Sequence, residues 1–185
     1  MKIFLAALLF FLPTISPDKV TVGDISFSRK ISTAGHLLEL NGAGIRNLWF
    51  LDLFAVGLYL EKPNTQPEEI IHCECPQALR IVIMSSLVTL EKFKEGIHDI
   101  LRKRLKEDIV LIEKDLALFK SLLGGELKVG SEIYAVYAPV DGLKIFRDGK
   151  YMGVIPGDTF KKETLRLWVG ELCVSDDLRD ELLGR

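Results

Sequence analysis

The order of segments along this chain of 185 residues predicts an α+β fold built on an antiparallel sheet. Strand-like segments come first, two helical segments follow, three strands then form a meander, and helices close the chain. The helical segments carry single apolar stripes, as helices that cover one face of a sheet do. Apolar residues make up 48% of the chain, which is enough for one two-layer core. No linker or repeat divides the sequence, so one domain is expected over residues 17–185.

Residues 1–16, MKIFLAALLFFLPTIS, are predicted to be a signal peptide. Lys2 supplies the cationic start, an apolar run follows it, and Pro13 ends the run. The run is too short to span a bilayer, and no second apolar run follows as a stop-transfer segment. We therefore expect a periplasmic or secreted protein without a stable transmembrane span. Retention of the leader as an N-terminal anchor stays open, because residues 14–16 lack the small-x-small pattern of a cleavage site.

The first half of the chain is expected to hold strands separated by turns. Residues 20–27 are interpreted as one short strand broken at Gly23, and residues 36–40 as another. Two glycines in residues 41–44 predict a turn, because glycine adopts positive φ without penalty. The almost continuous apolar run of residues 49–60 is typical of a strand that is buried on both faces or lines a cavity.

The second half alternates helices and strands with clear boundary residues. Pro67 predicts a short helix over residues 66–71, Thr89 is the expected N-cap of a long amphipathic helix, and Ser175 is the expected cap of the last one. The Asp148-Gly149 pair predicts a two-residue hairpin turn. The remaining expected elements are strands at 78–85, 132–138, 143–146 and 151–155 and helices at 113–123 and from about 158.

Charge and cysteine content exclude several classes of protein. The formal net charge of −2 argues against a nucleic-acid partner, which would require a basic face. The three cysteines, Cys73, Cys75 and Cys173, do not form a disulfide framework, although Cys173 pairing with one of the others stays open. No second ligand pair accompanies Cys73 and Cys75 at zinc-like spacing, so neither a metal site nor a cofactor is expected.

No familiar catalytic motif occurs in the sequence, and no catalytic residue is predicted. One residue stands out. Arg46 lies between the glycine-rich segment and the apolar run, with no acid nearer in sequence than Asp52. A guanidinium beside an apolar wall is unfavourable without an anion or an acceptor. Two structural alternatives are an exposed turn arginine and a buried arginine bonded to backbone carbonyls.

The segment LNGAGIR (residues 40–46), followed by AVGLYLEKP (residues 55–63), resembles the chalcone isomerase-like family. The resemblance continues through the strand at 78–85, the helix that begins after Thr89 and holds Phe93-Lys94-Glu95, and the ending LRLWVGELCVSDDLRDELLG (residues 165–184). It covers residues 36–184 and is greatest to the short bacterial exported branch. The implied fold is an open-faced β-sandwich, a large antiparallel sheet with a layer of helices on one face.

The resemblance also implies a site. In the family's enzymes the arginine that matches Arg46 attracts an anionic oxygen of the substrate, and in fatty-acid-binding members it is associated with holding a carboxylate. The family's catalytic threonine, tyrosine, lysine and final polar residue fall at Phe54, Phe93, Gly96 and about Ile100, so the groups that polarise the ketone are missing.

The sequence therefore predicts a non-catalytic protein that binds a small amphipathic, fatty-acid-like ligand in the cleft between sheet and helices. The expected ligand-binding residues are Arg46 at the polar end and Phe54, Val56, Phe93 and Ile97 as the apolar wall. One alternative is an isomerase or intramolecular lyase of chalcone isomerase type. Another is an interaction protein whose cleft is closed by side chains. The oligomeric state has no sequence signal.

Overall fold

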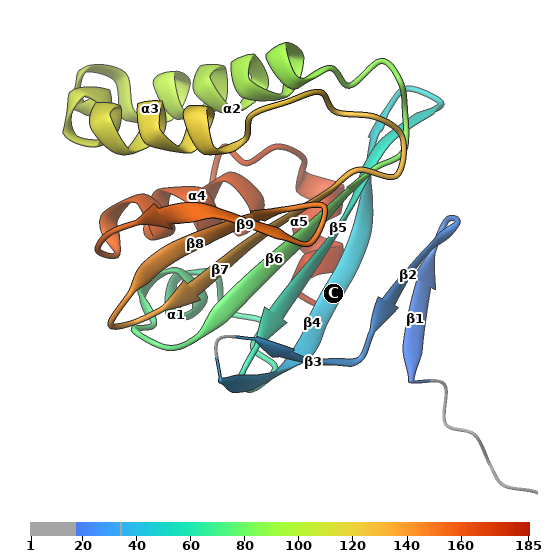
Figure 1. Ribbon diagram of the computed structural model, residues 1–185. Helices are drawn as coiled ribbons and strands as arrows, with labels where there is room; N and C mark the ends of the chain where they lie inside the picture. Colours follow the sequence, from blue (N-terminus) through green and yellow to red (C-terminus); the bar gives the residue numbers. More distant parts are fainter. Residues whose placement is uncertain (1–17, 34) are drawn as a thin grey trace, which may run out of the picture.

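The computed structural model describes residues 18–33 and 35–185, and the expected signal peptide lies outside these residues. Seven strands form one sheet in the order β3-β4-β5-β6-β7-β8-β9, each antiparallel to its neighbours, which confirms the predicted α+β class (Figure 1). The strands are β3 (Lys30–Thr33), β4 (His36–Leu48), β5 (Leu51–Leu60), β6 (Gln77–Ile83), β7 (Glu132–Ala138), β8 (Gly142–Arg147) and β9 (Lys150–Ile155).

Helices cover only one face of this sheet, as predicted. They are α1 (Pro67–His72), α2 (Leu90–Leu105), the 3-10 helix η1 (Lys106–Ile112), α3 (Glu113–Leu122), α4 (Thr159–Val169) and α5 (Asp176–Leu182). All of them contribute to one buried cluster with the same face of the strands. The opposite face packs instead against a two-stranded hairpin, β1 (Lys19–Val22) and β2 (Ile25–Ser28), through the buried Phe27. The arrangement is the open-faced sandwich that the family resemblance implied.

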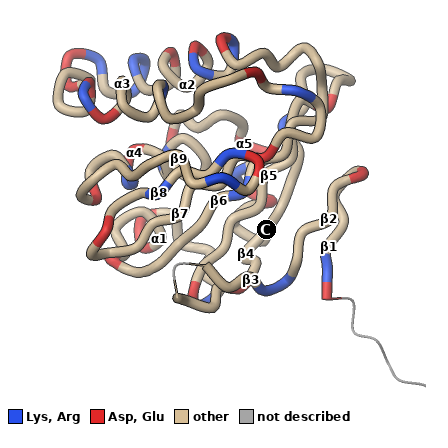
Figure 2. The backbone as a smooth tube through the Cα atoms, viewed as in Figure 1, with Lys and Arg blue, Asp and Glu red and all other residues tan. Residues whose placement is uncertain are grey.

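Helix α2 follows from its sequence. The side chain of Thr89 accepts a hydrogen bond from the backbone N–H of Lys92 at 3.3 Å, which satisfies one of the free donors at the helix start. The buried residues Leu90, Phe93, Ile97 and Leu101 recur at helical spacing and face the sheet. Figure 2 shows Lys, Arg, Asp and Glu along α2 and α3, while the central strands are largely uncharged. Burial of one apolar stripe therefore orients the helix.

The predicted turn at residues 41–44 is wrong, because β4 continues through it to Leu48. The glycines serve close approach rather than positive φ. A Cβ atom on Gly42 would lie 2.1 Å from the backbone oxygen of Glu181, and one on Gly44 would lie 1.7 Å from the Glu181 carboxylate. Both glycines therefore let α5 lie against the strand. The chain turns later, at Trp49 and Phe50, between Leu48 and Leu51.

The segment interpreted as one broken N-terminal strand is the β1–β2 hairpin, and Arg80 of β6 holds it against the sheet. The Arg80 guanidinium donates to the backbone oxygen of Ser26 at 2.7 Å and to the carboxylate of Glu132 at 2.5 Å. Its carbon Cζ lies 5.0 Å from the centre of the Phe27 ring. This arginine therefore links the hairpin, the core beneath it and β7 through hydrogen bonds and a cation–π contact.

The cysteine pairing that the sequence left open is decided at the end of α1. Cys73 and Cys75 form a disulfide, and Cys173 is free. The closed loop contains a single intervening residue, so the bridge restricts the unfolded chain only slightly and adds little stability through loop closure. It does not link distant elements, in agreement with the expectation that the cysteines form no framework.

Candidate functional site

The register of β4 on β5 sets the direction of the Arg46 side chain. Arg46 is paired directly with Phe54, and directly paired residues point to the same face of a sheet. Phe54 belongs to the buried cluster on the helix side. Arg46 therefore points toward the helices, into the space that α2 covers.

A cavity of about 370 Å³ opens between this end of the sheet and α2. Its volume lies within the range of small-molecule sites. Within the described part of the chain, the residues of its wall are apolar except for two cations, Arg46 and Lys92, and none of them is acidic. The lining residues are Arg46, Leu48, Leu53, Phe54, Leu87, Val88, Lys92, Phe93, Gly96, Ile97, Ile100, Trp168 and Val174. The alternative of a cleft closed by side chains is therefore wrong.

Three aromatic rings form the inner wall of the cavity. The Phe54 ring lies 6.0 Å from the Phe93 ring and 6.0 Å from the Trp168 ring, and both contacts are edge-to-face. This geometry is favourable for aromatic pairs and holds the rings in place. The wall is therefore preformed by residues of β5, α2 and α4.

Arg46 has no hydrogen-bond or ion-pair partner among residues 18–33 and 35–185. The acid nearest to it in sequence, Asp52, accepts a hydrogen bond from the side chain of Asn47 at 2.6 Å instead. Among the same residues, Arg46 is not bonded to backbone carbonyls either, which was one structural alternative. Such bonds are made by Arg147, whose guanidinium donates to the carbonyl oxygens of Leu123, Gly124 and Glu126. Arg46 is thus free to bind an anion in the cavity.

Four of the five residues predicted to bind ligand lie in the cavity wall: Arg46, Phe54, Phe93 and Ile97. Val56 does not. It is fully buried and is paired with Gly44, where α5 lies against the sheet, so its side chain packs beneath α5 rather than beside α2. Val56 is thus on the expected face of β5, but it lies two residues beyond Phe54 and outside the cavity wall.

The structure adds lining residues that the prediction missed. Gly96 and Ile100 follow Phe93 at helical spacing, so the stripe of α2 carried the signal for them. Together with Phe54 and Phe93, they are the four positions where the resemblance puts the family's catalytic groups, and all four line this one cavity. Trp168 and Val174 come from the end of the chain, and no local pattern indicated them.

Gly96 leaves room in the cavity. It lies inside a helix of 16 residues, where glycine is about 0.5–1 kcal/mol less favourable than alanine. No neighbouring atom requires its small size, since a Cβ atom there would meet nothing within 4 Å. Its effect is therefore to keep open space beside α2.

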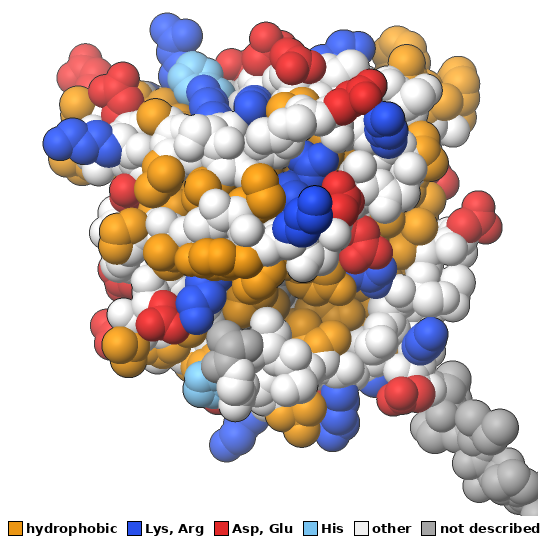
Figure 3. Space-filling view, viewed as in Figure 1, with side chains coloured by type: hydrophobic (Ala, Val, Ile, Leu, Met, Phe, Trp, Pro, Cys, Tyr) orange, Lys and Arg blue, Asp and Glu red, His pale blue; other side chains and the backbone are white. Residues whose placement is uncertain are grey.

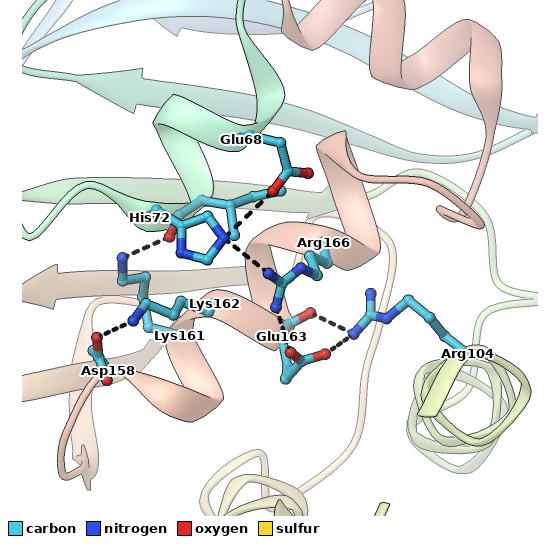
Figure 4. Close-up of polar contacts among 9 residues, drawn as sticks. Glu68, His72, Arg104, Asp158, Lys161, Lys162, Glu163 and Arg166 are labelled. Atoms are coloured by element: carbon cyan, nitrogen blue, oxygen red, sulfur yellow. Dashed lines mark hydrogen bonds and ion pairs between the residues drawn. The ribbon is translucent and has the colours of Figure 1, made fainter. Parts of the chain in front are cut away.

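A second polar cluster joins α1, α2 and α4 outside the cavity (Figure 4). Glu163 accepts hydrogen bonds from Arg104 and, at 2.6 Å, from Arg166. Arg166 continues to His72, 3.1 Å away, and His72 lies 3.3 Å from Glu68. The side chains of Arg104 and Glu163 are almost fully buried. Each member has a protein partner, so the cluster connects three helices rather than offering a free acid or base.

Lys161 is the other buried charge of this region. Its ammonium group donates to the backbone oxygens of Ile71 at 3.0 Å and Cys73 at 2.7 Å, and it lies 4.6 Å from the centre of the Tyr137 ring. Burial lowers the pKa of Lys161 from its usual 10.5 to about 8. The side chain satisfies the last carbonyls of α1 and so fixes that helix to α4.

This depressed pKa predicts a pH effect on stability. Between pH 8 and 10.5 the unfolded chain keeps a proton on Lys161 that the folded chain has released, so the free energy of unfolding rises with pH in this window. Relative to Lys161→Met, the wild type is expected to gain about 2 kcal/mol between pH 7.5 and pH 10. Urea unfolding of both proteins at several pH values measures the difference. Parallel pH profiles would show that Lys161 does not titrate in this range.

The comparisons with known proteins agree with this geometry. A profile described as chalcone isomerase-like matches residues 19–184. The fold is similar to the crystal structure of a fatty-acid-binding protein from Arabidopsis thaliana, with a TM-score of 0.71, 18% sequence identity, and coverage of 89% of this chain and 95% of that chain. No curated protein matches the sequence. The family match spans nearly the whole described chain, and the chain therefore belongs to the chalcone isomerase-like family.

Proposed function

We propose that this protein binds a small amphipathic anion, with a fatty acid as the leading ligand class, in the cavity between the sheet and α2. The observation that carries the proposal is an apolar cavity of about 370 Å³ with Arg46, which has no partner among the described residues, in its wall. An aliphatic chain would lie against Phe54, Phe93 and Ile97, and its carboxylate would bind the guanidinium, whose fork matches it. The fatty-acid-binding protein with the same fold supports this ligand class.

We further propose that the protein does not catalyse chalcone cyclisation. The positions that carry hydroxyl and lysine groups in the family's enzymes hold Phe54, Phe93 and Gly96 here, and none of these side chains polarises a ketone. Incubation with a panel of chalcones at neutral pH tests this, and turnover clearly above the uncatalysed rate contradicts it.

Lys92 is the observation that favours the alternative, an isomerase or intramolecular lyase. It lines the same cavity and brings a second cation near Arg46, where it would stabilise a developing oxyanion. If a chalcone is turned over, Lys92→Met should abolish the turnover, whereas a ligand carrier should bind fatty acid with or without this lysine.

Export is also a proposal. The cationic Lys2 and the apolar run after it support a signal peptide that is either cleaved or kept as a membrane anchor. The Cys73–Cys75 disulfide supports an oxidising compartment. Among residues 18–33 and 35–185, no helix is both long and apolar enough to cross a membrane. Cell fractionation and intact-mass analysis of the protein from its own host separate a processed protein from an anchored one.

Gly96 provides a test of the cavity itself. Gly96→Leu places an isobutyl group in the open space beside α2 and is expected to weaken fatty-acid binding about tenfold or more, because ligand volume is lost. Gly96→Ala is the matched control. It should stabilise the empty protein by about 0.5–1 kcal/mol through helix propensity. Calorimetric titration and thermal melts measure both effects. Unchanged affinity in Gly96→Leu would place the ligand elsewhere.

A further inference from the structure

The tip of the β4–β5 hairpin exposes two large aromatic side chains. Trp49 is 87% exposed and Phe50 is 86% exposed, and the flanking Leu48 and Leu51 are partly exposed. Figure 3 shows hydrophobic side chains gathered at the upper right, where Figure 1 shows the end of this hairpin. Contiguous exposed apolar side chains of this kind usually mark a contact surface. We refer to residues 48–51 as the apolar tip.

Turn formation does not account for the residues of the tip. Leu48 pairs with Leu51, so Trp49 and Phe50 form a two-residue turn, and Trp49 has a φ of 57°. Glycine or asparagine is preferred at such a position, and a bulky residue with positive φ is an outlier. The backbone conformation of the turn therefore does not explain why Trp49 occupies this position.

The apolar tip is continuous with the cavity. Leu48 lines the cavity, and so does Leu87 from the segment before α2, which is 51% exposed. Arg46 and Lys92 lie in the same wall, while the exposed carboxylate of Asp52, which accepts a hydrogen bond from Asn47, keeps one negative charge beside the tip. An apolar surface bordered by two cations therefore leads from the tip into the cavity.

We propose that the apolar tip inserts into the surface of a lipid bilayer and that ligand passes between the bilayer and the cavity beside it. The inference rests on the proposed function, since an amphipathic ligand of the cavity resides in membranes. Trp and Phe favour the membrane–water interface, and the exposed Lys92 would face anionic headgroups there. A bilayer fits better than a protein partner because the tip is a narrow, protruding turn, whereas stable protein interfaces bury about 800 Å² on each side.

Vesicle binding tests the proposal. Trp168 is already buried, so a blue shift of tryptophan emission on adding phosphatidylethanolamine–phosphatidylglycerol vesicles to the full chain would report on Trp49. The double variant Trp49→Gly/Phe50→Ser places Gly-Ser in the turn, which suits its backbone and should keep or raise the melting temperature. Its partitioning into vesicles, measured by co-sedimentation, is expected to fall about tenfold or more.

Val110→Ser/Leu111→Ser is the matched control, because these residues of η1 are 65% and 75% exposed and lie at the opposite end of α2 from the cavity. This control should bind vesicles like the wild type. Equal partitioning of wild type and tip variant, or no partitioning by either, would overturn the proposal. Sedimentation experiments could also overturn the proposal. If the wild type and the control are dimers and the tip variant is a monomer, a second copy of the chain covers the tip.

The same variant separates this inference from the proposed function. Trp49 and Phe50 do not line the cavity, so the tip variant should keep the affinity for soluble fatty acid while losing vesicle binding and fast ligand transfer from vesicles. If the tip variant loses vesicle binding but the wild type binds no fatty acid, the proposed ligand is refuted and the membrane contact stands. If the tip variant binds both vesicles and fatty acid like the wild type, the membrane contact alone is refuted.

Discussion

Replacement of Arg46 by alanine is expected to weaken binding of a fatty acid by about 2–4 kcal/mol, the range for loss of a charge-assisted pair in a partly buried site. The reason is that Arg46 is in the cavity wall and has no partner within the described part of the chain, so the ligand carboxylate would supply its only bidentate contact. The affinity of Arg46→Lys for fatty acid should lie between those of the wild type and Arg46→Ala, because lysine keeps the charge but not the planar fork. Calorimetric titration of the three proteins measures these differences.

The stability of the ligand-free protein should not fall when Arg46 is replaced by alanine. Removal of a cation that has no partner among the described residues from an apolar wall is expected to leave the melting temperature unchanged or slightly raised. Arg102→Ala is the control, since Arg102 lies on the exposed side of α2 and should affect neither property. Equal affinities of wild type and Arg46→Ala would remove Arg46 from ligand binding. A large loss of stability in the empty variant would assign it a structural role instead.

Gly42→Ala is expected to cost about 3 kcal/mol of folding stability, the upper part of the range for overpacking. The new Cβ atom would lie 2.1 Å from the backbone oxygen of Glu181 and 2.6 Å from that of Leu182. Both contacts are with backbone, so α5 has to move away from β4. The movement also breaks the hydrogen bond from the Asn41 side chain to the Leu182 oxygen and loosens a buried part of the core.

Gly96→Ala is again the matched control for this prediction. It makes the same chemical change, but in open space and inside a helix, and it should stabilise rather than destabilise. Urea unfolding of the two variants measures the contrast. If both variants have the same stability, the contact between β4 and α5 is looser than its geometry indicates.

Most of the fold could be predicted because its signals are local. The caps at Thr89 and Ser175 bond to backbone groups three residues ahead, and Pro67 begins α1 in the expected place. The apolar stripe of α2 and the turn at Asp148-Gly149 also depend only on close neighbours in sequence. Such signals act within one or two helical turns, so they are legible without the rest of the chain.

The glycines of β4 show where local signals end. The same residue type serves a turn through positive φ or a close contact through its missing Cβ, and sequence neighbours do not distinguish the two. At Gly42 and Gly44 the deciding partner is Glu181 of α5, nearly the whole domain away along the chain. Neither use changes the local pattern, so the turn was predicted where a strand exists.

The candidate site divides in the same way. Sequence and resemblance together selected Arg46, Phe54, Phe93 and Ile97, and all four lie in the wall of one cavity. The pairing of Arg46 with Phe54 and the helical spacing of Phe93 and Ile97 put them on the facing sides of two adjacent layers. Only tertiary packing excluded Val56, which lies under α5, and recruited Trp168 from α4. Alternation determines which face a side chain occupies. Which helix covers that part of the face depends on contacts between segments far apart in sequence, and those contacts form only when the chain folds.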